Sequence, residues 1–222
     1  MNANSLKAAR IAIFAALYAA LSCIPISVFI GASSLLSLNL IVTPTIAILL
    51  SPLEAFLSSL LGSIISLYVA PFQAVFGPYT ILLPVSGATL ASLGFHKPRT
   101  GFFASIYLGV VSLTYIIMRP EFPYWVIPHI VGAIIVGGLN FKNPIPDKVK
   151  IPLYAFISTI CEQATMLIGA LFILSLPWTI FAAAFPLMLY ERLIGTIGGT
   201  LLTYSLYLKC KEYFTLRGVH SN

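Results

Sequence analysis

Three charged side chains and one amide lie deep inside long apolar segments of this sequence, where such groups are rare. Glu162 and Gln163 lie about 18 Å from the start of one segment, and Glu191 and Arg192 lie at a comparable depth in the next. An unpaired charge costs several kcal/mol in such surroundings, so we expect Glu162 and Arg192 to form an ion pair. The pair either fixes the register of two helices, or forms the floor of a binding site in which Arg192 receives a ligand anion or carbonyl. A proton relay is a third interpretation.

Four other side chains are candidates for the wall of such a site. Asn39 either bonds one helix to another or serves as a pocket donor, and His129 is either a satisfied core group or a ligand or switch. Tyr79 and Trp125 belong to loops rich in aromatic residues. These aromatic residues form either an interfacial belt or the wall of a pocket that stacks a flat ligand.

Sequence motifs for catalysis are absent. There is no zinc-protease motif, no nucleophile elbow, no phosphate-binding loop, no metal-spaced cysteine cluster and no histidine pair spaced for haem. We therefore expect a protein that is not an enzyme and that holds no metal and no cofactor. The chain also lacks a nucleotide-binding module, so any active transport must draw energy from another subunit.

The composition is that of an integral membrane protein. Of the 222 residues, 59% are hydrophobic and 8% are charged, and the mean hydropathy is +0.99. Soluble domains carry roughly 25% charged residues. The net charge of +6 comes from basic residues too few and too dispersed to bind nucleic acid. We expect residues 1–222 to form one helical domain embedded in a bilayer.

Eight apolar segments predict an all-α, polytopic transmembrane bundle of six to eight spans. The second and third are short and joined only by Ser51-Pro52. When the N-terminus is assigned to the cytoplasm, ten of the twelve basic residues lie on the inner side, Arg119 lies outside and Arg192 is embedded. Both termini are then cytoplasmic, at the cell membrane. The segments cover roughly 8–25, 35–50, 53–70, 78–94, 102–118, 124–140, 150–176 and 178–208.

Small residues recur along the first apolar segment at helical spacing, which places them on one face of a helix. Such a strip lets another helix approach closely in lipid. The strip is buried inside this protein's own bundle or is the docking face for a partner subunit. Its residues are Ala8, Ala12, Ala16 and Ala20, with Ala15 and Ala19 beside them.

Several of these stretches together resemble the substrate-binding S components of energy-coupling factor (ECF) vitamin transporters. The alanine pattern within Ala9–Ser22 is similar to the opening helix of that family, which faces a transmembrane T subunit. The uncharged loop 26–37 resembles the substrate lid, and Leu50–Gly62 resembles the turn into the third helix. Pro186–Leu208 looks like the last helix, where a polar residue often touches substrate. The family usually has six helices, so either two segments are re-entrant or a hairpin, 102–140, is added.

The resemblance implies a receptor that binds a vitamin or vitamin-like molecule from outside, under the first loop. The T subunit and two ABC-type ATPases would then carry the substrate inward. Two other functions remain open. The chain is an accessory subunit whose polar pairs only lock helices, or it is a stand-alone carrier or intramembrane enzyme that uses Glu162 and Glu191.

Overall fold

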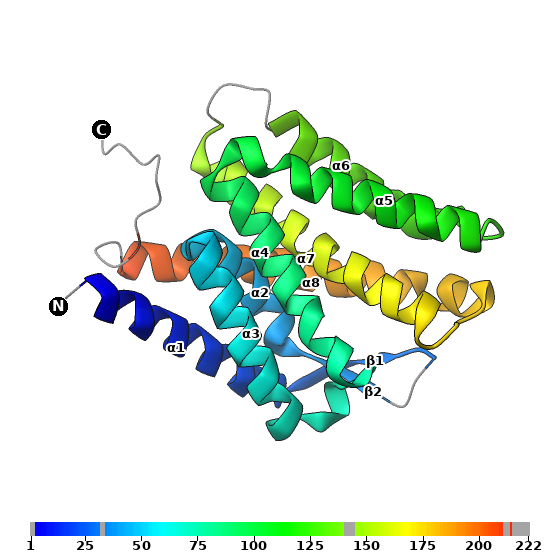
Figure 1. Cartoon of the computed structure of the whole chain (residues 1–222), viewed down its shortest axis with the longest axis horizontal. Helices are drawn as coiled ribbons and strands as arrows, with labels where there is room; N and C mark the ends of the chain where they lie inside the picture. Colours follow the sequence, from blue (N-terminus) through cyan, green and yellow to red (C-terminus); the bar gives the residue numbers. More distant parts are fainter. Residues whose placement is uncertain (1–2, 32–33, 140–144, 211–213, 215–222) are drawn as a thin grey trace.

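A computed structural model describes residues 3–31, 34–139, 145–210 and 214 (Figure 1). Lys142, Lys211 and Arg217, which entered the charge argument, lie outside these residues. The described chain is all-α apart from one short hairpin. It contains eight α-helices: α1 (Ala3–Ser22), α2 (Val42–Leu49), α3 (Pro52–Val69), α4 (Leu82–His96), α5 (Phe102–Met118), α6 (Ile127–Leu139), α7 (Asp147–Phe172) and α8 (Trp178–Lys209). Strands β1 (Pro25–Phe29) and β2 (Ser34–Ser37) form the hairpin.

Five helical stretches of the described chain are long and apolar enough to cross a membrane, which suggests a membrane location. Three further apolar helices are shorter. Each of the eight apolar segments of the sequence therefore contains a helix. The long stretches are Asn4–Ser22, Pro52–Val69, Gly77–His96, Lys148–Phe172 and Trp178–Lys209, and the shorter ones are Leu38–Leu49, Phe102–Met118 and Pro123–Leu139.

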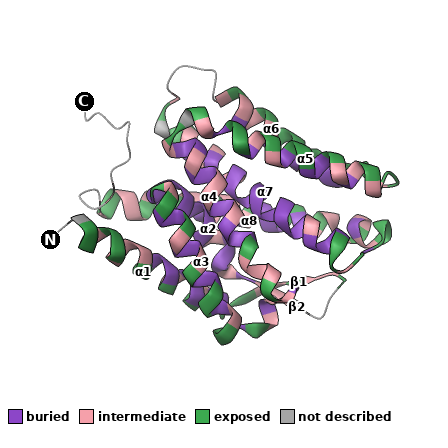
Figure 2. Ribbon diagram, in the orientation of Figure 1, coloured by how far each residue is buried: buried purple, intermediate pink, exposed green. Residues whose placement is uncertain are grey.

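The short helix α2 is the centre of the bundle, and all eight of its residues are buried (Figure 2). It packs closely against α8, because a Cβ atom on Gly199 would lie only 2.3 Å from Cγ of Pro44. The Thr45 hydroxyl donates to the Gly199 carbonyl across this contact at 3.3 Å. A long helix can approach a buried one so closely only where it carries glycine.

Helix α7 forms the second axis of the core. A Cβ on Gly87 of α4 would lie 2.8 Å from the Ser158 carbonyl oxygen, so α4 and α7 are in backbone contact there. Helices α5 and α6 form a hairpin that packs on α7, on the side away from α1 and α3 (Figure 1). This helical hairpin lies at the edge of the bundle, on the α7 side.

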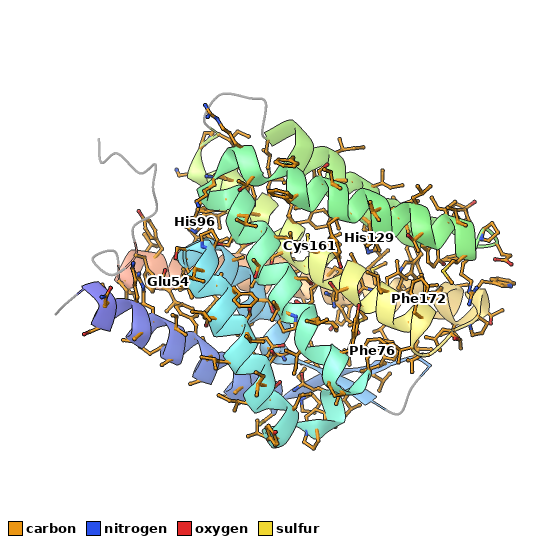
Figure 3. All side chains as sticks on the ribbon, in the orientation of Figure 1. Glu54, Phe76, His96, His129, Cys161 and Phe172 are labelled. Carbon is orange, nitrogen blue, oxygen red and sulfur yellow. The ribbon has the colours of Figure 1, made fainter. Side chains whose placement is uncertain are left out.

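A capping box begins α3 and joins it to α1. Ser51 donates to Oε2 of Glu54 through its backbone N–H at 3.0 Å and its hydroxyl at 2.7 Å. The other carboxylate oxygen of Glu54 binds Arg10 at 2.5 Å. Figure 3 shows Glu54 and His96 at the end of the bundle where α1 begins, opposite the β-hairpin. We call these two ends the N-terminal end and the hairpin end.

Candidate binding site

The β-hairpin covers the hairpin end of α7 and α8. Its strands are antiparallel, with Ser27 opposite Leu36 and Phe29 opposite Ser34. Gly31 lies in the turn after β1 with a φ of 106°, a left-handed conformation that favours glycine. A Cβ built there would lie 3.1 Å from Leu176 and 3.1 Å from Ile180, so the backbone at Gly31 packs against the turn after α7 and the first turn of α8. The loop 26–37, expected to be a lid, is therefore a β-hairpin packed over the bundle.

Two cavities of about 40 Å³ each lie beneath this hairpin. The first, the apolar cavity, is lined mainly by hydrophobic groups, with Gln163 and Glu191 as its polar members. Trp125 forms part of its wall, and its ring packs edge-on against Phe181 at 5.1 Å between centroids. Phe29 of the hairpin also lines it.

The second, the polar cavity, holds more hydrogen-bonding groups. Its polar lining comes from seven elements, which the fold brings together from distant parts of the chain. Leu36 and Met166 line both cavities, so these two side chains separate them. The polar members are Tyr18, Ser37, Asn39, Gln73, Thr80, Glu162 and Arg192.

Asn39 belongs to a closed hydrogen-bond network. Its Nδ2 donates to the Ser22 hydroxyl at 2.9 Å and to Oε1 of Gln73 at 2.9 Å. Gln73 in turn donates to the Ser22 carbonyl at 2.6 Å. Both hydrogens of the Asn39 amide are therefore already donated within the protein. Asn39 ties the end of α1 to two loops, and it lines the polar cavity.

The expected ion pair between Glu162 and Arg192 is not formed among the described residues. Nη1 of Arg192 donates to the Thr159 carbonyl at 3.0 Å, and Nη2 lies 3.8 Å from Oε2 of Glu191. The Ser27 hydroxyl of the hairpin donates to the other oxygen of Glu191. Glu162 and Arg192 both line the polar cavity, as their comparable depth indicated. The guanidinium of Arg192 is nevertheless directed to the Thr159 carbonyl and to Glu191.

Glu162 is left with an incomplete set of partners. The side chain is 7% exposed, and its Oε2 atom is buried without a hydrogen bond. The nearby Thr43 hydroxyl does not complete one. A buried acceptor without a donor costs about 1–3 kcal/mol, more when it is charged. Such a group in a cavity wall is suited to receive a ligand donor.

The remaining sequence candidates are distributed differently. Trp125 and Gln163 line the apolar cavity, and each has one buried polar atom without a hydrogen bond. Tyr79 lines neither cavity, because its hydroxyl donates to the Thr165 carbonyl at 2.9 Å and its ring packs on Phe76. His129 also lines neither, since it is completely buried on α6 where α6 packs on α7 (Figure 3).

Sequence reasoning missed several members of the site. Ser27 and Phe29 lie in the loop expected to be a lid, but nothing in an uncharged loop marks which residue points inward. Met166 lies one turn beyond Glu162 on α7, a spacing that places both on one face. Gln73 could most readily have been recognised as a site residue, because it is the sole amide in the apolar stretch 71–79.

The alanine strip of α1 divides between two surfaces. Ala8, Ala12, Ala16 and Ala20 are exposed, as expected for an outward face. Ala15 and Ala19 are instead buried, which corrects the expectation that they belong to that face. They pack in the bundle because α1 meets α3 there, and a Cβ on Gly62 would lie 3.1 Å from the Ala15 carbonyl oxygen.

An apolar groove of about 340 Å³ lies next to the exposed row, between α1 and the end of α8. It is lined by Leu6, Ala9, Arg10, Ile13, Phe14, Leu17, Leu206, Cys210 and Phe214.

No group of three or more histidine, cysteine, aspartate or glutamate residues in the described chain could hold a metal ion.

Comparison of the chain with protein-family models, with curated proteins and with solved structures finds no match.

Proposed function

We propose that this protein is the substrate-capture subunit of an importer of the energy-coupling factor type, and that it binds a vitamin-like small molecule beneath the β-hairpin. One observation carries the proposal. A hairpin anchored by the Ser27–Glu191 hydrogen bond covers two adjoining cavities that are lined by buried charges, amides and aromatic rings. Buried polar groups of this kind are costly in a merely structural core.

Binding requires the hairpin to move. Ligand pockets usually enclose about 300–1,000 Å³, whereas each cavity here holds about 40 Å³. Leu36 belongs to the hairpin and Met166 has a flexible side chain, and these are the residues that separate the cavities. Lifting the hairpin withdraws Leu36 and joins the two spaces. The described conformation is therefore the closed one.

We place the hairpin end outside the cell and both termini in the cytoplasm. In this arrangement α1 to α4, α7 and α8 form the transport core, and α5–α6 is an additional hairpin. Support comes from basic residues, because Arg10 and Lys150 bond near the N-terminal end, to Glu54 and to the Phe95 carbonyl. Single cysteines at Glu121 and Arg99 test the topology. A membrane-impermeant thiol reagent added to intact cells should label the first and not the second.

The outward face of α1 is the surface that we propose for contact with a partner subunit. We assign the exposed row Ala8, Ala12, Ala16 and Ala20, with the apolar groove beside it, to a transmembrane helix of the T subunit. Two cytoplasmic ATPases bound to that subunit supply the energy. The protein itself performs no chemistry.

The direct experiment is to purify the chain from cells grown in rich medium and to identify any bound compound by mass spectrometry. The compound, added back to stripped protein, should raise the midpoint of thermal unfolding. Trp125→Ala should abolish this shift, whereas Tyr124→Ala should preserve it, because Tyr124 is 59% exposed and lines neither cavity. If no compound is retained and no vitamin in a panel shifts the midpoint, the proposal is wrong.

An accessory subunit of a larger membrane complex is the second candidate. It is favoured by the network of Ser22, Asn39 and Gln73, in which the described donors are satisfied and the helices are locked. In that case replacing Glu162 and Arg192 together by leucine should leave the complex functional. Loss of ligand binding in a folded double variant favours capture instead.

A further inference from the structure

The charges beneath the hairpin do not balance. The charged residues that line the two cavities are Glu191 in the apolar one and Glu162 and Arg192 in the polar one. With both carboxylates ionised, two negative charges face one positive charge. All three side chains are buried, at 7% exposure or less, so bulk water screens them poorly.

Two of the three nitrogens of the single guanidinium already have partners, while its buried Nε makes no hydrogen bond. The guanidinium donates to the Thr159 carbonyl and faces Glu191, whose other oxygen receives the Ser27 hydroxyl. Glu191 thus has partners on both oxygens. The unmatched charge resides on Glu162, whose Oε2 makes no hydrogen bond.

We infer that the captured molecule is a small organic cation with a flat apolar body, an inference that rests on the proposed function and specifies its substrate class. Its charged nitrogen lies against Glu162 in the polar cavity. Its ring occupies the apolar cavity, where Trp125, Phe29 and Phe181 supply aromatic surface. Aromatic faces also attract cations, so both parts of the site favour the same charge.

An anionic ligand fits the same residues poorly. The sequence alone allowed Arg192 to receive an anion, but Nη1 and Nη2 of its guanidinium are directed to Thr159 and Glu191, which leaves only Nε without a partner. An anion in the polar cavity would also add a further negative charge beside Glu162. Like charges at close range in a buried site are strongly unfavourable.

Three probes of one ring system separate these cases: 1-methylnicotinamide, nicotinamide and nicotinate, which are cationic, neutral and anionic. Their dissociation constants are measured by calorimetry on the full, detergent-solubilised chain stripped of bound compound. We expect the cation to bind at least about tenfold more tightly than either of the others. Nicotinate or nicotinamide binding more tightly than the cation overturns the inference and leaves the proposed function standing. Failure of all three to bind, with no compound co-purifying, overturns both.

A matched pair of variants assigns the effect to Glu162. Glu162→Gln should weaken cation binding about tenfold or more and change nicotinamide binding less than about twofold. Glu121→Gln removes the same charge from an exposed loop position and should change neither. If Glu162→Gln does not fold, Glu162→Asp keeps the charge and should retain the preference for the cation. Unaltered cation affinity in folded Glu162→Gln contradicts the assignment.

Discussion

Removing one hydroxyl from the hairpin should loosen the whole hairpin. In Ser27→Ala the hydrogen bond from Ser27 to Glu191 is lost, and with it the polar anchor between β1 and α8. Hydrogen bonds to charged groups contribute about 1.5–3 kcal/mol. Because Ser27 is only half-buried, we take the lower end, about 1.5 kcal/mol. Every 1.4 kcal/mol changes an equilibrium tenfold, so the open fraction of the hairpin should rise about tenfold.

Hydrogen–deuterium exchange on the detergent-solubilised protein measures this opening. Amides of β1 and β2 should exchange about tenfold faster in Ser27→Ala, because their exchange requires the hairpin to open. Ser112→Ala is the matched control, since its hydroxyl bonds only to the Leu108 carbonyl one turn earlier in α5. Adding Glu191→Gln to Ser27→Ala should cause little further change in the hairpin.

The reasoning would be refuted if Ser27→Ala exchanged like the parent in β1 and β2, within about twofold. It would also be refuted if exchange rose equally in α5 and α6, because the hydroxyl would then support global stability rather than hairpin closure.

Two other predictions concern helix faces. Ala19→Leu should lower the apparent Tm, because Ala19 is buried and overpacking a core costs about 1–3 kcal/mol. Ala16→Leu, on the exposed row, should leave Tm unchanged and weaken association with a T subunit in a pull-down assay. Equal Tm values for the two variants would contradict the assignment of Ala19 to the core and Ala16 to the outer face. Gly199→Ala forces a methyl group against Pro44 and should lower Tm by several degrees, at about 2–4 °C per kcal/mol. Gly138→Ala, where a Cβ meets nothing within 4 Å, should hold or raise Tm; a loss there equal to that at Gly199 would sink the packing argument.

The helical segments could be predicted from the sequence, because long apolar runs leave the backbone no other way to satisfy its hydrogen bonds. The β-hairpin could not. Its strands are short, its turn depends on the conformation of Gly31, and its position depends on contacts with Leu176 and Ile180 at the far end of the sequence.

Depth along a helix could be predicted, but rotation about the helix axis could not. Glu162 and Arg192 reached the same cavity, as their positions in the sequence indicated, yet Arg192 faces Thr159 and Glu191. The same limit explains Ala15 and Ala19, since two adjacent alanine rows on one helix do not reveal which of them meets α3. The face that a helix turns toward its neighbours depends on packing between helices, which cannot be read from the sequence of one segment alone.

The central claim is that the hairpin closes over a captured molecule. Its most direct measurement is hydrogen exchange in β1 and β2 with and without the compound extracted from the purified protein. We predict one bound molecule per chain and slower exchange of the hairpin amides in its presence, while exchange in α5 and α6 is unchanged. A chain that retains no compound, or a compound that binds and leaves hairpin exchange as it was, would contradict the account.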